Sequence, residues 1–426
     1  MTPEVKERID QIRHGIVPEG YKKGKLGIVP AEWNEVPFST LFTTTNDYTD
    51  NLERYPLYSL TIEDGITAKT ERYERSHLVK RENSYKVVRP DDYAYNPMNI
   101  RFGAVARHKG SKPVAVSGYY DIFTTVNECD HVFMDSFLTC GPMITYYNKV
   151  SKGSLVEKQR VHFSNFLAFS LPLPPLGERI KIAEILSVQD KVIELEQQKI
   201  EEIMKAKRFF IEKMFPKKSE TVPEIRFKGF TDPWEQRKAV DLAEYSKGNG
   251  YSKGDLTDIG TPIILYGRLY TKYQFVINEV DTFAVPRNGA VYSQGNEVIV
   301  PASGETAEDI ARASAVGKSG VLLGGDLNIL RPFDFINPLF LALAISNGEP
   351  QNELAKKAQG KSVVHIHNSD IQEVTIAYPS RTEQDQIVSF FRQLDHLITL
   401  HQRKLEEEKK KKKALMQLLL TGIVRV

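Results

Sequence analysis

Two long stretches of the chain place apolar residues at alternating spacings of three and four, the pattern of a helix that buries one stripe. The pattern runs from Ile182 to Met214 and from Ile387 to Leu419 without glycine or proline. Each stretch exceeds four heptads, which predicts two long helices paired as a coiled coil; two amphipathic helices inside a compact core are the alternative. The residues expected in the helix-pair seam are Leu186, Ile193, Ile200, Ile203, Phe210, Phe391, Leu394, Ile398, Leu405 and Leu415.

The two stretches are copies of one another. Residues 174–215 align without gaps with residues 379–420 at a constant offset of 205, and 12 of the 42 positions are identical. The same offset pairs His162 with His367, and the segments around Trp33 and Trp234 match loosely. The sequence therefore predicts one architecture present twice.

Connectivity favours antiparallel helices, because the region between them then joins two neighbouring helix ends. The N-terminal Gly15-Ile16-Val17 echoes Gly422-Ile423-Val424, so the first residues are expected to complete the repeat at the end of the second helix. The predicted organisation is a pseudo-two-fold dumbbell with an N-terminal segment at 1–19, a globular region at 20–171, a helix at 172–218, a second globular region at 219–377 and a second helix at 378–426.

The two globular regions are dense in Val, Ile, Tyr, Phe and Thr, with Gly, Pro and Asn at the breaks. Strands are predicted at 38–48, 87–95, 104–116 and 132–147 in the first region and at 262–265, 282–292, 298–301 and 321–330 in the second. Residues 337–346 are predicted as a short buried helix. The expected fold class is α+β, with two mixed α/β regions joined by the helix pair.

Composition excludes several classes of protein. The 426 residues allow two or three domains, and 57 Lys and Arg against 55 Asp and Glu exclude a histone-like cationic protein. Two cysteines, Cys129 and Cys140, without a CxxC motif exclude a disulfide scaffold and a cysteine-rich zinc site. Because no signal peptide and no apolar run of ~20 residues is found, we expect a soluble, cytoplasmic protein.

Two short motifs suggest catalysis but lack the context that it needs. Residues 355–362 (AKKAQGKS) fit a relaxed P-loop, yet a helical segment precedes them and a strand follows, the reverse of a working P-loop. Residues 96–99 (NPMN) resemble part of an adenine methyltransferase motif without its second proline, its aromatic residue or a methyl-donor loop. We therefore expect no catalytic residue, no metal site and no cofactor bound by this chain.

Basic residues are concentrated locally. Between Lys69 and Lys112, eleven Lys or Arg stand against five Asp or Glu, with tyrosines interleaved. Lys and Arg contact phosphates and guanine edges, while Tyr adds hydrogen bonds and stacking, so this pattern is compatible with nucleic-acid binding; an ordinary solvated surface is the alternative for any single residue. The candidate DNA-binding residues are Lys69, Arg72, Arg75, Lys80, Arg81, Lys86, Arg101, Arg107, Lys109 and Lys112 in the first region and Lys247, Tyr251, Lys253, Arg268, Lys272 and Tyr273 in the second.

The repeat, together with three segments, resembles the specificity (S) subunit of type I restriction-modification systems. The segments are residues 222–235 (VPEIRFKGFTDPWE), 172–178 (PLPPLGE) and 260–264 (GTPII). The layout matches over essentially the whole chain. The globular regions match in outline only, and the first tryptophan segment is weaker than the second.

The resemblance implies a non-catalytic reader of double-stranded DNA. Each globular region would be a target recognition domain for one half of a split site, and the helices would set the gap and dock two methyltransferase (modification) subunits. S-adenosylmethionine, ATP and Mg would then belong to those subunits and to restriction/translocase subunits. Two alternatives remain open: a self-contained adenine methyltransferase or nuclease, and a coiled-coil adaptor without a DNA role.

Overall fold

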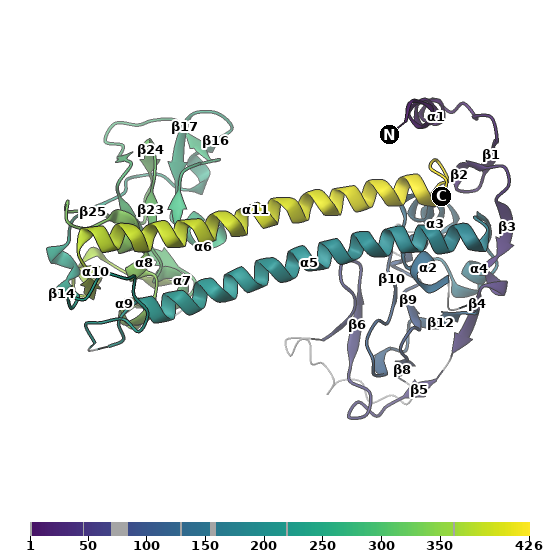
Figure 1. The fold of residues 1–426 in the computed structure, drawn as a ribbon, viewed down its shortest axis with the longest axis horizontal. Helices are drawn as coiled ribbons and strands as arrows, with labels where there is room; N and C mark the ends of the chain where they lie inside the picture. Colours follow the sequence, from purple (N-terminus) through teal and green to yellow (C-terminus); the bar gives the residue numbers. More distant parts are fainter. Residues whose placement is uncertain are drawn as a thin grey trace. The chain divides into compact units, whose positions relative to one another are not determined.

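The computed structural model describes residues 2–45, 47–69, 84–127, 130–153, 159–218, 220–360 and 363–426. The chain divides into two compact units (Figure 1), which we call the first unit (Met1–Glu196 with Lys404–Val426) and the second unit (Gln197–Arg403). Both boundaries fall inside the long helices α5 (Leu176–Met214) and α11 (Arg381–Leu420). Each unit therefore contains one globular region and a part of both helices.

The first globular region alternates short strands with short helices. Its elements are α1 (Pro3–Arg13), β1 (Tyr21–Gly24), β2 (Gly27–Pro30), β3 (Asn34–Pro37), η1 (Phe38–Thr40), β4 (Phe42–Thr45), β5 (Tyr48–Thr49), β6 (Tyr58–Thr61), β7 (Gly65–Ala68), β8 (Tyr85–Val88), β9 (Tyr93–Tyr95), η4 (Ile100–Phe102), β10 (Val105–Arg107), β11 (Val114–Ser117), β12 (Asp121–Thr125), α2 (His131–Phe137), α3 (Gly141–Val150), α4 (Phe163–Leu167) and β13 (Ser170–Leu173).

The second globular region is built from a similar series. Its elements are β14 (Glu235–Lys238), η7 (Ala239–Asp241), β15 (Ala243–Lys247), η8 (Lys253–Asp255), β16 (Leu256–Thr257), β17 (Thr261–Ile264), α6 (Arg268–Thr271), β18 (Val276–Ile277), β19 (Phe283–Ala284), β20 (Tyr292–Gln294), β21 (Val298–Pro301), β22 (Ser303–Gly304), α7 (Ala307–Ile310), β23 (Ser314–Val316), β24 (Ser319–Leu323), β25 (Leu327–Pro332), α8 (Pro338–Ile345), α9 (Gly348–Lys357), β26 (Val364–His365), α10 (Asn368–Gln372) and β27 (Thr375–Tyr378).

The two regions share one strand order although their sequences align poorly. The main sheet of the first unit runs β4-β12-β9-β10, and that of the second runs β15-β25-β21-β23 with β18 added at its edge. In each unit a second sheet pairs two antiparallel strands, β8 with β11 and β20 with β24. The helices α2, α3 and α4 and the strand β13 recur in the same order as α8, α9, α10 and β27. The repeat predicted from the helices therefore extends through the fold of both regions.

The central strand of each main sheet is buried on both faces. In β9, Tyr93 and Tyr95 pack into the cluster that contains the helices, whereas Ala94 packs beneath the second sheet. In β21, Val298 and Val300 pack into the cluster that contains the helices of the second unit, and Ile299 packs into a separate cluster on the opposite face. In each unit we call the cluster that contains the helices the helix-side cluster. Side chains alternate across a strand, so one short strand joins two cores. This double burial explains why these strands are continuously apolar in the sequence.

Helices α5 and α11 run antiparallel within each unit, as predicted. In the first unit, Gln189 Nε2 donates to Glu408 Oε2 over 2.6 Å, and Glu196 Oε1 lies 2.5 Å from Lys404 Nζ. In the second unit, Lys207 Nζ lies 2.5 Å from Asp395 Oδ1. Rising numbers on α5 thus meet falling numbers on α11. All ten residues expected in the seam are buried or half-buried.

A buried ion pair holds the start of each long helix. Near the start of α5, Glu178 accepts from Arg425 Nε over 2.5 Å and from Arg425 Nη2 over 2.8 Å. Near the start of α11, Glu383 accepts from Arg226 Nε over 2.7 Å and from Arg226 Nη2 over 2.8 Å. The two glutamates stand 205 positions apart, and each arginine follows the end of the other long helix. We call these contacts the helix-start ion pairs.

The strand predicted at 132–147 is wrong, because the segment forms α2 and α3. Phe133, Met134 and Phe137 are buried at helical spacing, as are Met143 and Tyr147. The aromatic and β-branched content of the segment favours a strand, but the spacing of the buried positions is three and four rather than two. Packing against the helix-side cluster decided the outcome.

Candidate nucleic-acid interface

A cleft of about 980 Å³ opens in the second unit and gathers four of the predicted DNA-binding residues. It is bounded by residues 250–256, by the segment around α6 from Leu265 to Lys272, and by Asp281, Thr282, Gly325 and Asp326. Tyr251, Lys253, Arg268 and Lys272 all line it. Lys247 and Tyr273 do not line this cleft. We call it the second-unit cleft.

Arg268 and Lys272 share one carboxylate at the wall of the cleft. Arg268 Nη1 and Lys272 Nζ each lie 2.5 Å from an oxygen of Asp281. Arg268 Nη2 also donates to Gln274 Oε1 and to the Glu279 carbonyl, both over 2.9 Å. These two cations hold the pKa of Asp281 well below its usual range. The shared acid fixes both basic side chains along the wall.

The opposite wall is held by a turn around Tyr251. Ser252 N–H donates to Asp255 Oδ2 over 2.8 Å, and this bond, together with Arg287 and the Ser252 hydroxyl, lowers the pKa of Asp255 to about 2. Arg287 also lies over the Tyr251 ring, 5.1 Å from its centroid. The Tyr251 hydroxyl accepts from Arg287 N–H over 2.8 Å. Tyr251 is therefore a buried support of the cleft rather than an exposed stacking surface.

The chemistry of the cleft suits hydrogen-bond recognition better than bulk charge neutralisation. Lys253, Arg268 and Lys272 are matched by Asp255, Asp281 and Asp326 along the lining. Tyr266 and Tyr270 add two aromatic rings, with centroids 6.2 Å apart. Paired donors, acceptors and aromatic edges are the groups that read base edges in a groove. Asp281 and the two tyrosines were not predicted individually; the i, i+4 spacing of the tyrosines is a signal that could have found them.

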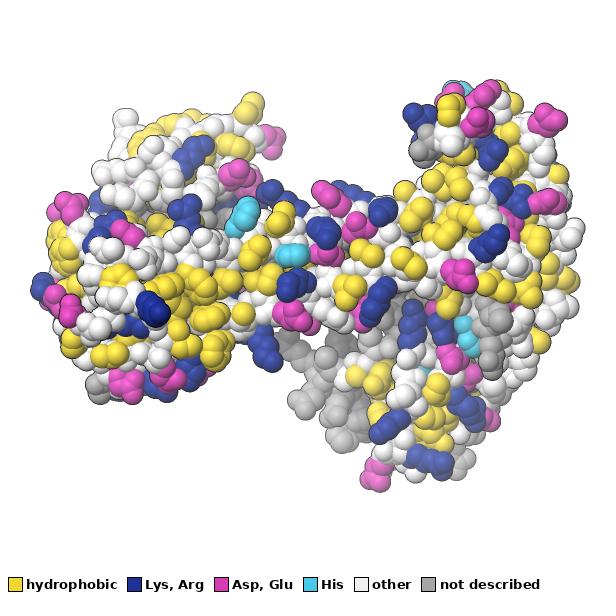
Figure 2. All heavy atoms as spheres, viewed as in Figure 1, with side chains coloured by type: hydrophobic (Ala, Val, Ile, Leu, Met, Phe, Trp, Pro, Cys, Tyr) yellow, Lys and Arg dark blue, Asp and Glu magenta, His cyan; other side chains and the backbone are white. Residues whose placement is uncertain are grey.

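The predicted basic residues of the first unit divide into three groups. Lys69, Lys109 and Lys112 are exposed. Arg72, Arg75, Lys80 and Arg81 lie outside the described residues. Lys86, Arg101 and Arg107 make internal contacts, and their burial argues against them as phosphate contacts. In Figure 2 basic and acidic side chains alternate over the face in view.

The internal contacts replace the basic patch expected around these residues. Lys86 is 5% exposed and donates to the Tyr120 carbonyl over 2.8 Å. Arg101 Nη1 donates to Gln159 Oε1 over 2.6 Å. A count of charges along the sequence cannot distinguish such buried cations from free ones.

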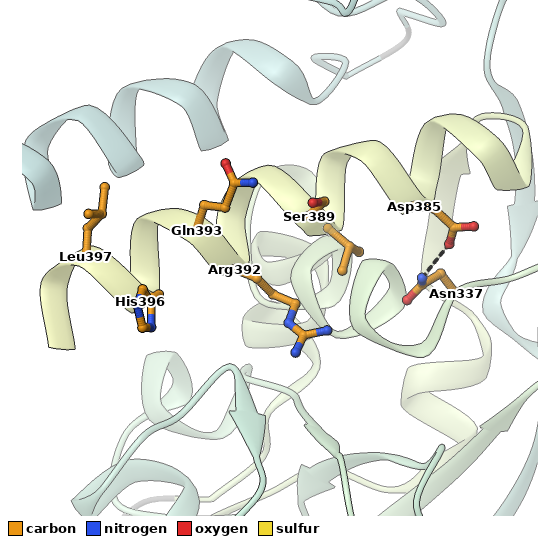
Figure 3. Close-up of a pocket in the computed structure, with 8 residues that line it drawn as sticks. Asn337, Asp385, Ser389, Arg392, Gln393, His396 and Leu397 are labelled. Atoms are coloured by element: carbon orange, nitrogen blue, oxygen red, sulfur yellow. Dashed lines mark hydrogen bonds between the residues drawn. The ribbon is translucent and has the colours of Figure 1, made fainter. Parts of the chain in front are cut away.

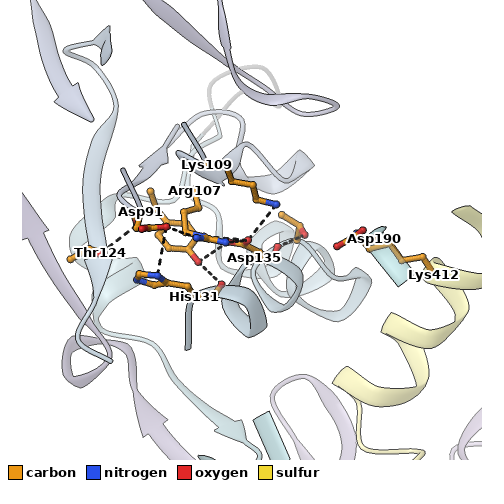
Figure 4. Close-up of polar contacts among 10 residues, drawn as sticks. Asp91, Arg107, Lys109, Thr124, His131, Asp135, Asp190 and Lys412 are labelled. Carbon is orange, nitrogen blue, oxygen red and sulfur yellow. Dashed lines mark hydrogen bonds and ion pairs between the residues drawn. The ribbon is translucent and has the colours of Figure 1, made fainter. Parts of the chain in front are cut away.

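Arg107 belongs to a polar network around Asp135 (Figure 4). Its Nη2 donates to Asp135 Oδ2 over 2.8 Å, and its Nη1 also contacts Asp91. The Tyr93 hydroxyl donates to Asp135 Oδ1 over 2.8 Å, and burial raises the pKa of Tyr93 far above its usual range. Lys109 Nζ lies 3.5 Å from Asp135 at the edge of the network. The network anchors α2 to the main sheet and leaves Lys109 at the surface.

A groove of about 740 Å³ follows one side of α11 in the second unit (Figure 3). Asn337 closes one end, where its Nδ2 donates to Asp385 Oδ1 over 2.7 Å. Arg392 and His396 extend from the same side of α11, and Gln393 and Leu397 extend from another side (Figure 3). No role was predicted for these residues from the sequence, because the apolar spacing of the long helix gives no signal for them.

One of the two motifs that suggested catalysis closes a turn, and the other lies partly outside the described residues. Asn96 Oδ1 accepts from the N–H groups of Met98 and Asn99 over 3.1 and 3.4 Å, so its side chain closes the turn before η4. Residues 355–357 end α9, and residues 361 and 362 lie outside the described residues.

Within the described residues, no helix has both the length and the apolar character needed to cross a bilayer. Across the same residues, no group of three or more His, Cys, Asp and Glu side chains is placed to hold a metal ion.

Comparison with known proteins gives consistent matches. A family model described as "Type I restriction modification DNA specificity domain" matches residues 119–205 and 231–409. The chain is 24% identical over 272 residues to the type I restriction enzyme MjaVIII specificity subunit of Methanocaldococcus jannaschii, and 24% identical over 295 residues to the putative MjaX specificity subunit of the same organism. These alignments cover 61% and 65% of this chain and 63% of each relative.

A solved structure has a similar fold. It comes from a study of "complex assembly and conformational transition of the type I R-M system", and the similarity covers 93% of this chain and 99% of that chain with a TM-score of 0.56 and 15% identity. At this identity the likeness concerns the fold. The family model matches more than half of the sequence, and the chain belongs to the type I restriction-modification DNA specificity family.

Proposed function

We propose that this chain is the non-catalytic specificity subunit of a type I restriction-modification complex and that its two globular regions read two separate halves of a DNA site. The observation that carries the proposal is the repeated fold. Two regions with the same strand order differ in the residues that they present, whereas the repeated segments 174–215 and 379–420 keep twelve identical positions. Two readers on one repeated framework fit a bipartite target.

DNA contact in the second region is assigned to the second-unit cleft. Lys253 and Lys272 are exposed there, whereas the Arg268 side chain is only 9% exposed and supports Lys272 through the Asp281 carboxylate that they share. In the first region the exposed Lys69, Lys109 and Lys112 are the remaining described candidates. Cations contribute affinity through phosphates, while the paired polar groups of the cleft contribute discrimination between bases.

The proposal places catalysis on partner subunits. Two modification subunits would dock on the helix pair and bring S-adenosylmethionine, and restriction/translocase subunits would bring ATP and Mg. Support comes from the family match and from the structural use of Asn96, the residue of this chain that came nearest to a methyltransferase motif.

The test is coexpression of the chain with its cognate modification subunit, followed by mapping of methylated adenines across the genome. We expect one split motif, with two short defined segments separated by an undefined gap. The double variant Lys253→Ala/Lys272→Ala should weaken methylation without changing the first half-site. A continuous motif, or methylation by the purified chain alone, would contradict the proposal.

A further inference from the structure

The final turns of each long helix border a groove, and the two grooves occupy equivalent positions in the two units. The first groove, of about 640 Å³, lies in the first unit between the end of α11 and the start of α3. The second groove, of about 290 Å³, lies in the second unit between the end of α5 and the start of α9. Neither groove is part of the candidate nucleic-acid interface.

The correspondence between the grooves holds residue by residue. From α11 and its end, the first groove is lined by Lys413, Met416, Gln417 and Thr421; 205 positions earlier, Arg208, Ile211, Glu212 and Pro216 line the second. From the short helices, Cys140, Gly141, Pro142 and Thr145 correspond to Asn347, Gly348, Glu349 and Asn352 at an offset of 207. The same surface is therefore built twice.

The shared chemistry of the two grooves is an apolar floor beside a free cation. Met416 and Ile211 are half-buried and pack on the cores of their units. Lys413 and Arg208 are exposed at the rim, and within the described residues neither has an ion-pair partner. Lys149 adds to the first rim and Lys218 adds to the second, whereas Lys25 is paired with Glu35 and Lys217 is paired with Glu224.

We propose that each groove binds the same short segment of a modification subunit, one copy per groove. The segment would place a hydrophobic side chain against Met416 or Ile211 and a carboxylate beside Lys413 or Arg208. This inference rests on the proposed function, under which one chain binds two modification subunits. A surface that occurs twice fits a partner that is present in two copies, and a rim of lysine and arginine selects an acidic one.

The grooves differ in one respect that predicts unequal binding. The second groove carries Glu212 and Glu349, where the first has Gln417 and Pro142. Among its described lining residues the first groove has no acid. An acidic segment is therefore repelled in part by the second groove, and the first modification subunit should bind at the first unit.

The experiment measures binding of the purified modification subunit to the full chain without DNA, by titration and native mass spectrometry. The variants are Lys413→Glu and Arg208→Glu, singly and together. Each single reversal should weaken one of two binding events roughly fivefold to thirtyfold, and the double variant should weaken both. Lys413→Glu should affect the tighter event.

Matched controls separate charge from misfolding. Arg54→Glu and Lys318→Glu make the same change at exposed positions outside both grooves and should leave both affinities unchanged. Thr145→Tyr and Asn352→Tyr obstruct equivalent positions without changing charge, and each should weaken one event.

The outcomes distinguish the inference from the function on which it rests. If the unaltered chain binds no modification subunit, the proposed function fails and this inference fails with it. If the unaltered chain binds two subunits and the groove variants bind them equally well, the grooves are not the docking sites and only this inference is overturned. If the groove variants lose binding of the restriction subunit but keep binding of the modification subunit, this inference is also overturned, because that result assigns the grooves to the restriction subunit.

Discussion

Near the start of each long helix a buried glutamate is paired with an arginine, but the two glutamates have different sets of partners. In the second unit, Glu383 is 1% exposed and its carboxylate accepts two hydrogen bonds from Arg226. In the first unit, Glu178 receives Arg425 and also the indole N–H of Trp33 over 3.2 Å. Trp234 is buried to a similar degree, yet its indole nitrogen has no hydrogen-bond partner among the described residues.

The two pairing arginines come from equivalent places in the repeat. Arg226 follows α5, whereas Arg425 stands at the C-terminal end of the chain after α11. Gly422 adopts φ +70°, and a Cβ there would lie 2.9 Å from Trp33, so the chain turns closely around the tryptophan after α11. The segment after α11 thus supplies the arginine that pairs with the start of α5, as the segment after α5 supplies the arginine that pairs with the start of α11.

The largest effect is expected from removing one arginine of a helix-start ion pair. Arg226→Met leaves Glu383 as an unpaired buried charge, which should lower the free energy of unfolding of the second unit by about 3–5 kcal/mol. Arg425→Met should cost less, since Trp33 still donates to Glu178. Urea titration monitored by hydrogen exchange in peptides of each unit would measure both values.

A compensating variant tests the physical reason. Arg226→Met/Glu383→Leu removes both charges and should recover most of the loss, because an apolar pair of similar volume carries no desolvation penalty. If the double variant is as unstable as Arg226→Met, lost packing rather than the stranded charge explains the effect.

Replacing the two tryptophans should have a smaller effect on stability, and the effect should differ between the two units. Trp33→Phe and Trp234→Phe remove the same ring volume, but only the first removes a hydrogen bond to a carboxylate, worth about 1.5–3 kcal/mol. Trp33→Phe should therefore destabilise its unit by roughly 1 kcal/mol or more beyond Trp234→Phe. Equal losses in the same exchange experiment would show that the Trp33–Glu178 bond adds nothing to packing.

Acid should loosen the second-unit cleft as its paired carboxylates take up protons. The pKa of Asp255 is lowered to about 2 and that of Asp281 is lowered further by Lys272 and Arg268. A carboxyl whose pKa is lower in the folded state stabilises that state above its unfolded pKa and loses the contribution as pH falls through the folded value. For Asp255 this window runs from about pH 4 to pH 2.

The measurement is hydrogen exchange of residues 250–256 between pH 5 and pH 2, corrected for intrinsic exchange rates. Protection should fall in this segment as the pH passes through the window. Because these cleft pairs are partly exposed, added salt at pH 5 should weaken them as well. Unchanged protection down to pH 2 would contradict the assignment.

The smallest effect is expected in the reactivity of the Cys140 thiol. Cys140 precedes α3 where Asn347 precedes α9, and burial raises the pKa of the Cys140 thiol to about 11. At pH 8 very little thiolate forms, so Cys140 should resist iodoacetamide in the folded protein and react after unfolding. Mass spectrometry of the Cys140 peptide would check this, and rapid labelling of folded protein would contradict the burial.

The sequence predicted the elements whose signal is local and periodic. The helix pair was predicted from the spacing of its apolar residues and its antiparallel direction from connectivity, and the structure has both, together with the short helix predicted at 337–346. The segment at 132–147 shows the limit, because its strand-like composition was overridden by packing against the helices.

Some residues of the candidate site were predicted from the sequence and others were not. Residues within one short stretch of chain gather in the cleft, as Arg268 and Lys272 do. Arg107 looked equally available but meets Asp135, 28 positions away, inside the first unit. The helix-start arginines were missed because each lies beyond the aligned part of the repeat. Long-range pairing of charges is a property of the fold that no local pattern reports.

The central claim is that two regions of one fold read two half-sites independently. The most direct measurement exchanges residues 20–171 for the first recognition region of another family member and maps adenine methylation in cells that also make the cognate modification subunit. We expect one half-site to change while the other half-site and the gap stay as they were. A chimera that is stable and active but changes both half-sites together, or changes neither, would contradict the claim.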